Sequence, residues 1–178
     1  LFMPDRWGQR MDTIGEYQSD DSAMGRINAW HMAYNLAKDR FFGGGFELAE
    51  PSTFLLYAPN PNDIHAAHSI YFQALGEHGF IGLGIYLLLG ALTWRSADWI
   101  VRHSRDLPDL AWAGGLAKTI QASMIGFAVG GAFLSLLYFD VPYYLMAAVV
   151  AMRILVERRR AELAAPAAVE PARAAAGA

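Results

Sequence analysis

Two histidines stand just before a long apolar segment, and their type and spacing suggest acid–base chemistry at a membrane surface. His65 and His68 are three residues apart, so they share one face of a helix that Asp63 would cap. A neutral imidazole accepts a proton near pH 7, which makes His68 a candidate general base. The structural alternative is a histidine that only caps or packs. Two histidines and a carboxylate are too common a set to indicate a metal site, and we predict none.

Arg26 is the second residue with a chemical signal, because it borders the apolar face of a predicted amphipathic helix over residues 22–40. At roughly 100° per residue it falls about 60° from the middle of that face. A cation in this position needs an anion nearby. A salt bridge to Asp21 or Asp63 would be structural, whereas a bound phosphate would match the planar guanidinium and be functional. The apolar face consists of Ala23, Ile27, Trp30, Tyr34 and Ala37.

Asp21 is expected to cap the N-terminus of this helix. Irregular segments are expected on both sides of it. Residues 1–20 are polar and show no apolar period. Residues 41–46 hold three glycines between phenylalanines, which should end the helix, and no Gly-Lys-Ser/Thr follows to make a nucleotide loop. Residues 47–63 contain three prolines and are expected to form a loop. Glu77 is expected to have a structural role, binding backbone or an arginine.

The composition indicates an all-α membrane protein. Of the 178 residues, 54% are hydrophobic and 17% are charged, and the hydrophobic excess lies after Phe80. Stretches with few or no charges predict three transmembrane helices, at about 75–96, 119–139 and 141–156. Residues 1–74 would form one extramembrane helical region before them.

Smaller features complete the predicted membrane part. Gly126 and Gly130 are separated by three residues, which favours close helix packing. Residues 140–142 are expected to form a tight reversal between the last two spans. Residues 157–178 contain three consecutive arginines at 158–160 and continue rich in alanine, so we expect a disordered tail.

The positive charges set the predicted topology. The connector over residues 95–118 holds four Lys/Arg, the segment after Val156 holds four more, and the reversal holds none. The positive-inside rule then places the connector and the C-terminus in the cytoplasm of a bacterial cell and residues 1–74 in the periplasm. Nucleotide sugars are absent there, so a transfer reaction needs a preactivated donor such as a lipid diphosphate. The net charge of −3 does not suggest a nucleic-acid partner.

Three motifs resemble the C-terminal half of the O-antigen ligase/polymerase family. They are Asp21-Ser-Ala-Met-Gly-Arg26-Ile-Asn-Ala-Trp30, the turn Gly43-Gly-Gly-Phe46, and His68-Ser-Ile-Tyr-Phe-Gln-Ala-Leu-Gly-Glu77-His-Gly79-Phe-Ile-Gly82-Leu. Within that family they look most like the O-glycosylation ligases associated with exosortase systems. The likeness runs from about residue 20 to the last span, so the chain is expected to be the C-terminal part of a larger protein.

The resemblance implies a polytopic inner-membrane enzyme of polysaccharide biosynthesis. Such an enzyme transfers a glycan from an undecaprenyl-diphosphate carrier to a hydroxyl of an acceptor protein, lipid or glycan, without metal or other cofactor. It implies that His68 is the catalytic base and that Arg26 binds the diphosphate. In the mechanism that we expect, Arg40 is a further cation on the leaving group. Without the family's upstream spans the donor groove would be incomplete, and the fragment inactive alone.

Three alternatives stay open at the level of sequence. A polysaccharide polymerase of the same family would join repeat units to one another and would change polymer length. A transporter or flippase fragment would need ionisable groups inside its spans, and residues 119–139 have none. A purely structural membrane anchor would leave Arg26 and His68 without a role.

Overall fold

The computed structural model describes the backbone of residues 5–165 and the side chains of residues 22–165, and the regular elements of this part of the chain are all helices. The prediction of an all-α chain is therefore confirmed for these residues. The elements in order are α1 (Asp5–Asp39), α2 (Pro51–Tyr57), α3 (Ile70–His103), the short 3-10 helix η1 (Pro108–Leu110), α4 (Ala111–Gly131) and α5 (Asp140–Ala164).

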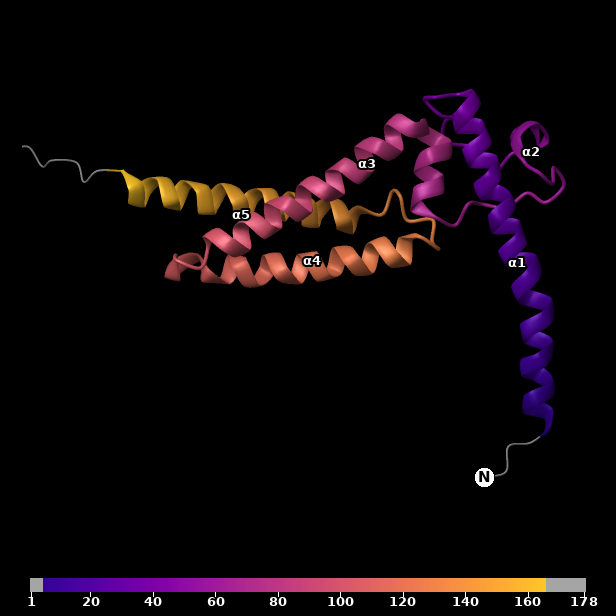
Figure 1. Ribbon diagram of the computed structural model, residues 1–178, viewed down its shortest axis with the longest axis horizontal. Coiled ribbons are helices and arrows are strands. Elements are labelled where there is room, and N and C mark those ends of the chain that lie inside the picture. Colours follow the sequence, from indigo (N-terminus) through magenta and orange to yellow (C-terminus); the bar gives the residue numbers. More distant parts are fainter. Residues whose placement is uncertain (1–4, 166–178) are drawn as a thin grey trace, which may run out of the picture.

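The helices form two parts that meet at a bend in α3. In Figure 1 the long second segment of α3 packs lengthwise with α4 and α5, whereas α1 runs crosswise to them beside the short first segment of α3. The core of the three-helix part is built from small and branched side chains that allow close helix contact. Its fully buried members include Ala97, Ile100, Ala117, Val149 and Val156.

A smaller core joins α2 to α1. Phe54 of α2 has no exposed surface and packs on Ala29, Met32 and Leu36 of α1. Pro51 opens α2 at a position where the missing N–H costs no helical hydrogen bond. The second half of α1 is thus fixed on its apolar face, as its sequence period predicts.

The bend in α3 is made by Gly79, whose φ of 67° and ψ of −165° interrupt the helix. The segment that we call the aromatic loop, residues 41–46, docks at this bend. Gly44 N–H donates to Gly76 C=O at 2.8 Å, Gly45 N–H donates to Glu77 C=O at 3.0 Å, and Phe80 N–H donates to Phe41 C=O at 3.2 Å. The aromatic loop therefore pairs backbone groups that the interrupted helix leaves without partners.

The close approach of the two segments requires glycine at the bend and in the loop. A Cβ on Gly79 would collide with the Phe41 carbonyl, and one on Gly43, which has φ 85°, would collide with the Glu77 carbonyl. Gly126 and Gly130, in contrast, face open space within the described structure, so the close packing expected there is not seen. Gly131 instead packs on Ile70.

Four expectations about local structure are wrong. Residues 51–57, expected in a loop, form α2, and residues 157–164, expected in a disordered tail, continue α5. The helix expected to begin at residue 22 begins at Asp5, so residues 5–20 are helical and not irregular. This stretch contains no proline, so nothing stops the hydrogen-bond ladder, and an apolar period marks only the part of a helix that packs. The reversal expected at residues 140–142 lies in residues 132–139, because Pro142 fits the first turn of α5, where its missing N–H is harmless.

The described residues contain one helix, α3, that is long and apolar enough to cross a membrane. Only 22% of its apolar window is buried inside the structure, unlike the core helix of a soluble domain. The helices α4 and α5 have the length of a span but fall short in apolar composition. They also do not match the expected limits, since α4 ends at Gly131 and α5 continues to Ala164. The count of three spans stays a prediction.

Replacing Gly79 by alanine should destabilise the protein, because the new Cβ meets the Phe41 carbonyl at a positive φ. We expect a loss of about 1–3 kcal/mol in the free energy of unfolding, measured by thermal unfolding in detergent. Gly84→Ala on the same helix is the matched control, since a Cβ there meets open space. That change should stabilise α3 by about 0.5–1 kcal/mol. Equal unfolding midpoints for the two variants would contradict this account of the bend.

Candidate functional site

The loop of residues 58–69, which carries both candidate histidines, is fastened to α1 by one buried asparagine. The Asn28 amide donates to the carbonyls of Asn60 at 2.8 Å and Asp63 at 2.9 Å, and its side-chain oxygen accepts the Asn60 N–H at 2.9 Å. Asn28 is only 6% exposed. Three hydrogen bonds from one side chain thus hold a loop that has no regular structure of its own.

The helix expected over His65 and His68 does not form, and this prediction is wrong. Residues 62–68 are non-helical, and α3 begins at Ile70. The Asp63 carboxylate lies 2.7 Å from His65 Nδ1, so it faces the histidine and does not cap a helix. His65 also packs against Gly25 of α1, where an added Cβ would lie 2.8 Å from the imidazole.

His68 occupies the corner between this loop and α3. Its φ of 43° is the one positive value among the non-glycine residues of the described chain. The residues beside it are held firmly, since Trp30 Nε1 donates to the Ala67 carbonyl at 2.6 Å and Ser69 is buried. The imidazole itself is exposed. A residue whose backbone is held in a sparsely populated conformation and whose side chain is open to solvent is typical of functional positions.

The indole of Trp30 connects this corner to α3 as well. Its ring stacks on Phe72 with centroids 4.8 Å apart and nearly parallel planes. One residue of α1 therefore holds the backbone before His68 by a hydrogen bond and the helix after it by stacking. The sequence pattern predicts only that Trp30 belongs to the apolar face of the helix. Its indole N–H, which needs an acceptor when buried, is the feature that points to this second contact.

The structure places the two candidate arginines at different ends of the part of α1 whose side chains it describes. Arg26 is half-buried. It follows Gly25 and lies within one turn of Asn28, so it is close in the helix to the residue that fastens the loop of residues 58–69. Arg40 is exposed just after the end of α1. Fourteen residues of helix separate the two by about 20 Å along the axis. The structure therefore brings Arg26, but not Arg40, to the turn of α1 that holds the loop of His68.

The expected structural ion pairs of Arg26 are not found among the described side chains. Asp63 is engaged with His65, and the side chain of Asp21 lies outside the described residues. No ion pair formed by residues 22–165 includes Arg26.

A cluster of polar side chains at the bend of α3 was not anticipated. Glu77 is 6% exposed and accepts hydrogen bonds from the Gln73 amide at 3.0 Å and from the Tyr138 hydroxyl. His78 Nε2 lies 2.8 Å from the same hydroxyl. The Glu77 carboxylate thus binds two side chains of this described cluster, and neither the expected arginine nor a backbone group is among its partners. The sequence feature that points to this cluster is Glu77, an ionisable residue inside an otherwise largely apolar helix.

The hydrogen bonds of this cluster have defined donors and acceptors. A tyrosine hydroxyl has one proton, and Tyr138 gives it to the carboxylate, so His78 Nε2 must carry the proton of its bond to the tyrosine oxygen. Partial burial, together with this bond to Glu77, raises the pKa of the Tyr138 phenol and keeps it protonated. Phe46 of the aromatic loop packs against both rings. The cluster thus ties the connector 132–139 to the bend.

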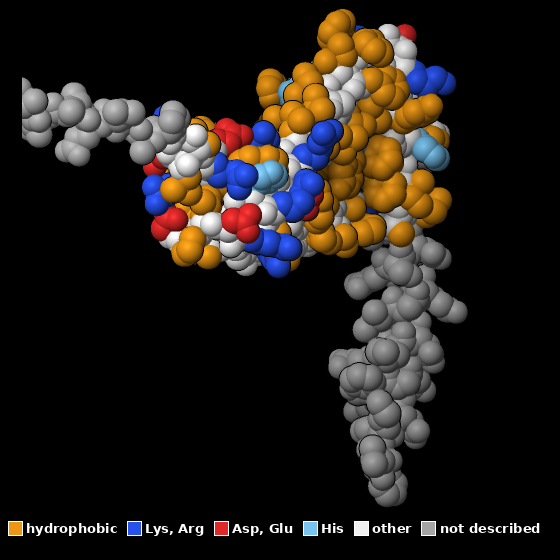
Figure 2. Space-filling view, turned by 60° about the vertical axis from the view of Figure 1, so that its left-hand side comes forward, with side chains coloured by type: hydrophobic (Ala, Val, Ile, Leu, Met, Phe, Trp, Pro, Cys, Tyr) orange, Lys and Arg blue, Asp and Glu red, His pale blue; other side chains and the backbone are white. Residues whose placement is uncertain are grey.

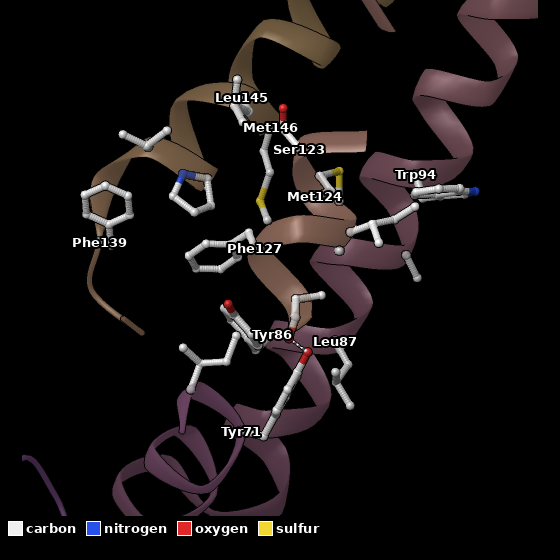
Figure 3. A pocket seen from close by; sticks show the side chains of 17 residues that line it. Tyr71, Tyr86, Leu87, Trp94, Ser123, Met124, Phe127, Phe139, Leu145 and Met146 are labelled. Atoms are coloured by element: carbon white, nitrogen blue, oxygen red, sulfur yellow. Dashed lines mark hydrogen bonds between the residues drawn. The ribbon is translucent and has the colours of Figure 1, made fainter. Parts of the chain in front are cut away.

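An apolar cavity of about 400 Å³ lies between α3, α4 and α5 (Figure 3). It begins at Ile70 and Tyr71, two and three residues after His68, and continues along α3 to Trp94. The Tyr71 hydroxyl donates to the Ala128 carbonyl at 2.9 Å and joins α3 to α4 at this end. The residues that directly follow the candidate base in the sequence therefore line an apolar cavity.

The Tyr138→Phe variant should lose stability, because it leaves the buried Glu77 carboxylate without one of its two donors. We expect a loss of about 1–3 kcal/mol in the free energy of unfolding, followed by thermal unfolding. Tyr144→Phe on α5 is the control, since that side chain is largely exposed. If both variants unfold at the wild-type temperature, the hydroxyl contributes nothing to holding the connector at the bend.

Comparison with known proteins gives one match. No curated protein and no solved structure matches the chain. Residues 1–87, just under half of the chain, match the model of a family described as O-antigen ligase. The matched range contains α1, α2, the loop of residues 58–69 and the bend of α3. It ends with the eighth residue of the long second segment of α3. Residues 1–87 are therefore similar to the O-antigen ligase family, which is a family of membrane proteins.

Proposed function

We propose that this chain carries the catalytic residues of a glycosyltransferase that moves a glycan from an undecaprenyl-diphosphate carrier to an acceptor hydroxyl. The observation that supports it most is the O-antigen ligase match over residues 1–87, which contains His68, Arg26 and Arg40. The reaction takes place at the periplasmic face of a bacterial inner membrane, with residues 1–74 outside and the C-terminus in the cytoplasm. The acceptor is a protein, a lipid or a second glycan.

His68 acts as the general base in this proposal. The imidazole takes the proton from the acceptor hydroxyl, and the freed oxygen forms a bond to the anomeric carbon of the lipid-linked sugar. The bond between that carbon and the diphosphate breaks, and undecaprenyl diphosphate leaves with the electron pair. An exposed ring on a backbone fixed by Trp30 supports this role, because the base must meet an incoming acceptor in a set orientation.

Arg26 holds the diphosphate in the same proposal. Arg26 lies on the turn of α1 that fastens the loop of residues 58–69, and planar guanidinium groups bind phosphate oxygens in pairs. Arg40 is about 20 Å further along the helix axis, so it would meet a different part of a long substrate. The apolar cavity that begins at Ile70 offers a surface for the carrier's isoprenoid chain beside the site.

Membership of the exosortase-associated ligases is a narrower form of the proposal, and it rests on the motif from His68 to Gly82. Ligase and polymerase activities differ in product length. A ligase leaves the length of the lipid-linked glycan unchanged when it transfers it, whereas a polymerase extends it. Sizing the glycan before and after incubation in membranes therefore distinguishes the two.

The His68→Ala variant should abolish most transfer while protein level and fold are kept. A positioned base contributes about 10²–10⁴-fold in rate, so release of undecaprenyl diphosphate from lipid-linked glycan should fall by that factor. The measurement uses membranes that contain the full-length protein and its acceptor. His31→Ala is the matched control, because it removes another exposed imidazole from this region. Wild-type rates with His68→Ala would refute the role of His68.

The Arg26→Ala variant should weaken use of the lipid-linked donor. Loss of a charged hydrogen bond of about 1.5–3 kcal/mol corresponds to an increase of about ten-fold or more in the KM for the donor. Arg26→Lys should recover only part of it, because an ammonium group cannot form the paired contact. Arg102→Ala, which removes an exposed arginine at the far end of α3, is the control. Equal KM values for all variants would rule out diphosphate binding by Arg26.

A further inference from the structure

The aromatic loop exposes large apolar side chains. Phe42 and Phe46 keep 74% and 72% of their surface exposed, and Phe41 keeps 56%. The rings of Phe41 and Phe42 lie 5.8 Å apart, so they form one patch. Residues 41–46 contain no charged side chain. Leaving such rings in water forgoes about 1.5–3 kcal/mol per side chain, so the exposed rings indicate a partner surface.

The place of the aromatic loop on α3 indicates which surface this is. The loop is bound to the bend through the Phe80 N–H, and the rings of Phe41 and Phe80 lie 6.0 Å apart. Phe80 and Ile81 are themselves partly exposed, and they open the stretch of α3 whose apolar side chains face outward. The patch therefore joins the outer face of the candidate membrane helix at the level where that face begins.

Two cations stand directly before the patch. Lys38 and Arg40 are exposed at the end of α1, and the Lys38 ammonium lies 5.6 Å from the centre of the Tyr34 ring. Basic side chains beside exposed aromatics are typical of segments at the boundary between lipid headgroups and acyl chains. Figure 2 shows hydrophobic side chains covering much of one side of the molecule, while a large mixed group of charged side chains lies where the C-terminal residues leave.

We infer that the aromatic loop inserts into the headgroup–acyl boundary of the bilayer on the side where α1 lies. Phe41 and Phe42 contact the lipid chains, and Lys38 and Arg40 contact lipid phosphates. The crosswise direction of α1 relative to α3, α4 and α5 suits a helix that lies along the membrane surface when the other three cross it (Figure 1). This inference does not depend on the proposed glycosyl transfer.

The test uses a nitroxide spin label, because the chain has no cysteine of its own. The label is attached at Phe42→Cys in a full-length protein whose only cysteine is the introduced one. The protein is reconstituted into vesicles of phosphatidylethanolamine and phosphatidylglycerol. Collision rates of the label with oxygen, which concentrates in lipid, and with a water-soluble nickel chelate are then measured. Asn62→Cys, in an exposed polar loop, and Leu88→Cys, on the outer face of α3, give the reference values.

Insertion predicts an oxygen-to-nickel collision ratio at residue 42 that is several-fold above that at residue 62 and approaches that at residue 88. A ratio equal to that at residue 62 would show that the aromatic loop lies in water and would overturn the inference. Low collision rates with both reagents would show that another part of the protein covers the patch, which would also overturn it. Because Phe42 is mostly exposed, the label replaces few contacts within the fold.

Discussion

Three backbone hydrogen bonds between the aromatic loop and the bend of α3 are the interaction on which the rest of the structure depends. An uninterrupted helix would direct Phe80 N–H to Gly76 C=O, and Gly79 prevents this. The aromatic loop supplies a donor to Gly76 and an acceptor to Phe80, so the interruption leaves neither group without a partner. Buried backbone groups without partners are costly, most of all near lipid, where water cannot replace them.

The bend allows one helix to serve two purposes. Its first segment lies beside α1, where the Trp30–Phe72 stack holds it and where His68 precedes it. Its second segment leaves in a different direction and forms the outward-facing apolar surface together with the core shared with α4 and α5. The Glu77–Tyr138–His78 cluster also stabilises the bend, because it attaches the connector between α4 and α5 to it. The proposed base and the membrane segment are thus fixed to one another through Gly79.

The candidate site is assembled from loops on a helical frame. The loop of residues 58–69 has few internal hydrogen bonds, and its position comes from Asn28 and Trp30 on α1. Arg26 belongs to the same few turns of α1. A rigid helix that presents a cation and also fastens the loop of a histidine can hold both groups in a constant relation, which transfer between two large substrates requires. The O-antigen ligase match covers this whole assembly.

The sequence by itself determined the helical class, the apolar face of α1, the end of α1 before the glycines and the long apolar segment in α3. These features follow from local properties, namely side-chain periodicity, the conformational freedom of glycine and hydropathy. The family resemblance also came from residue order alone. Arg26 and His68 were identifiable as candidates because their residue types suit phosphate binding and proton transfer, although their roles are proposals.

Only the tertiary structure decided how these parts meet. Whether His68 lies on a helix depended on Asn28, 40 residues earlier, whose amide binds the Asp63 carbonyl that the expected helix would have used for its first hydrogen bond. The bend at Gly79 and the bond between Tyr138 and Glu77 depended on residues 32 to 61 positions apart in the chain. No local pattern encodes such contacts, because a hydrogen bond between distant segments exists only when the packing of the whole chain brings the donor to the acceptor.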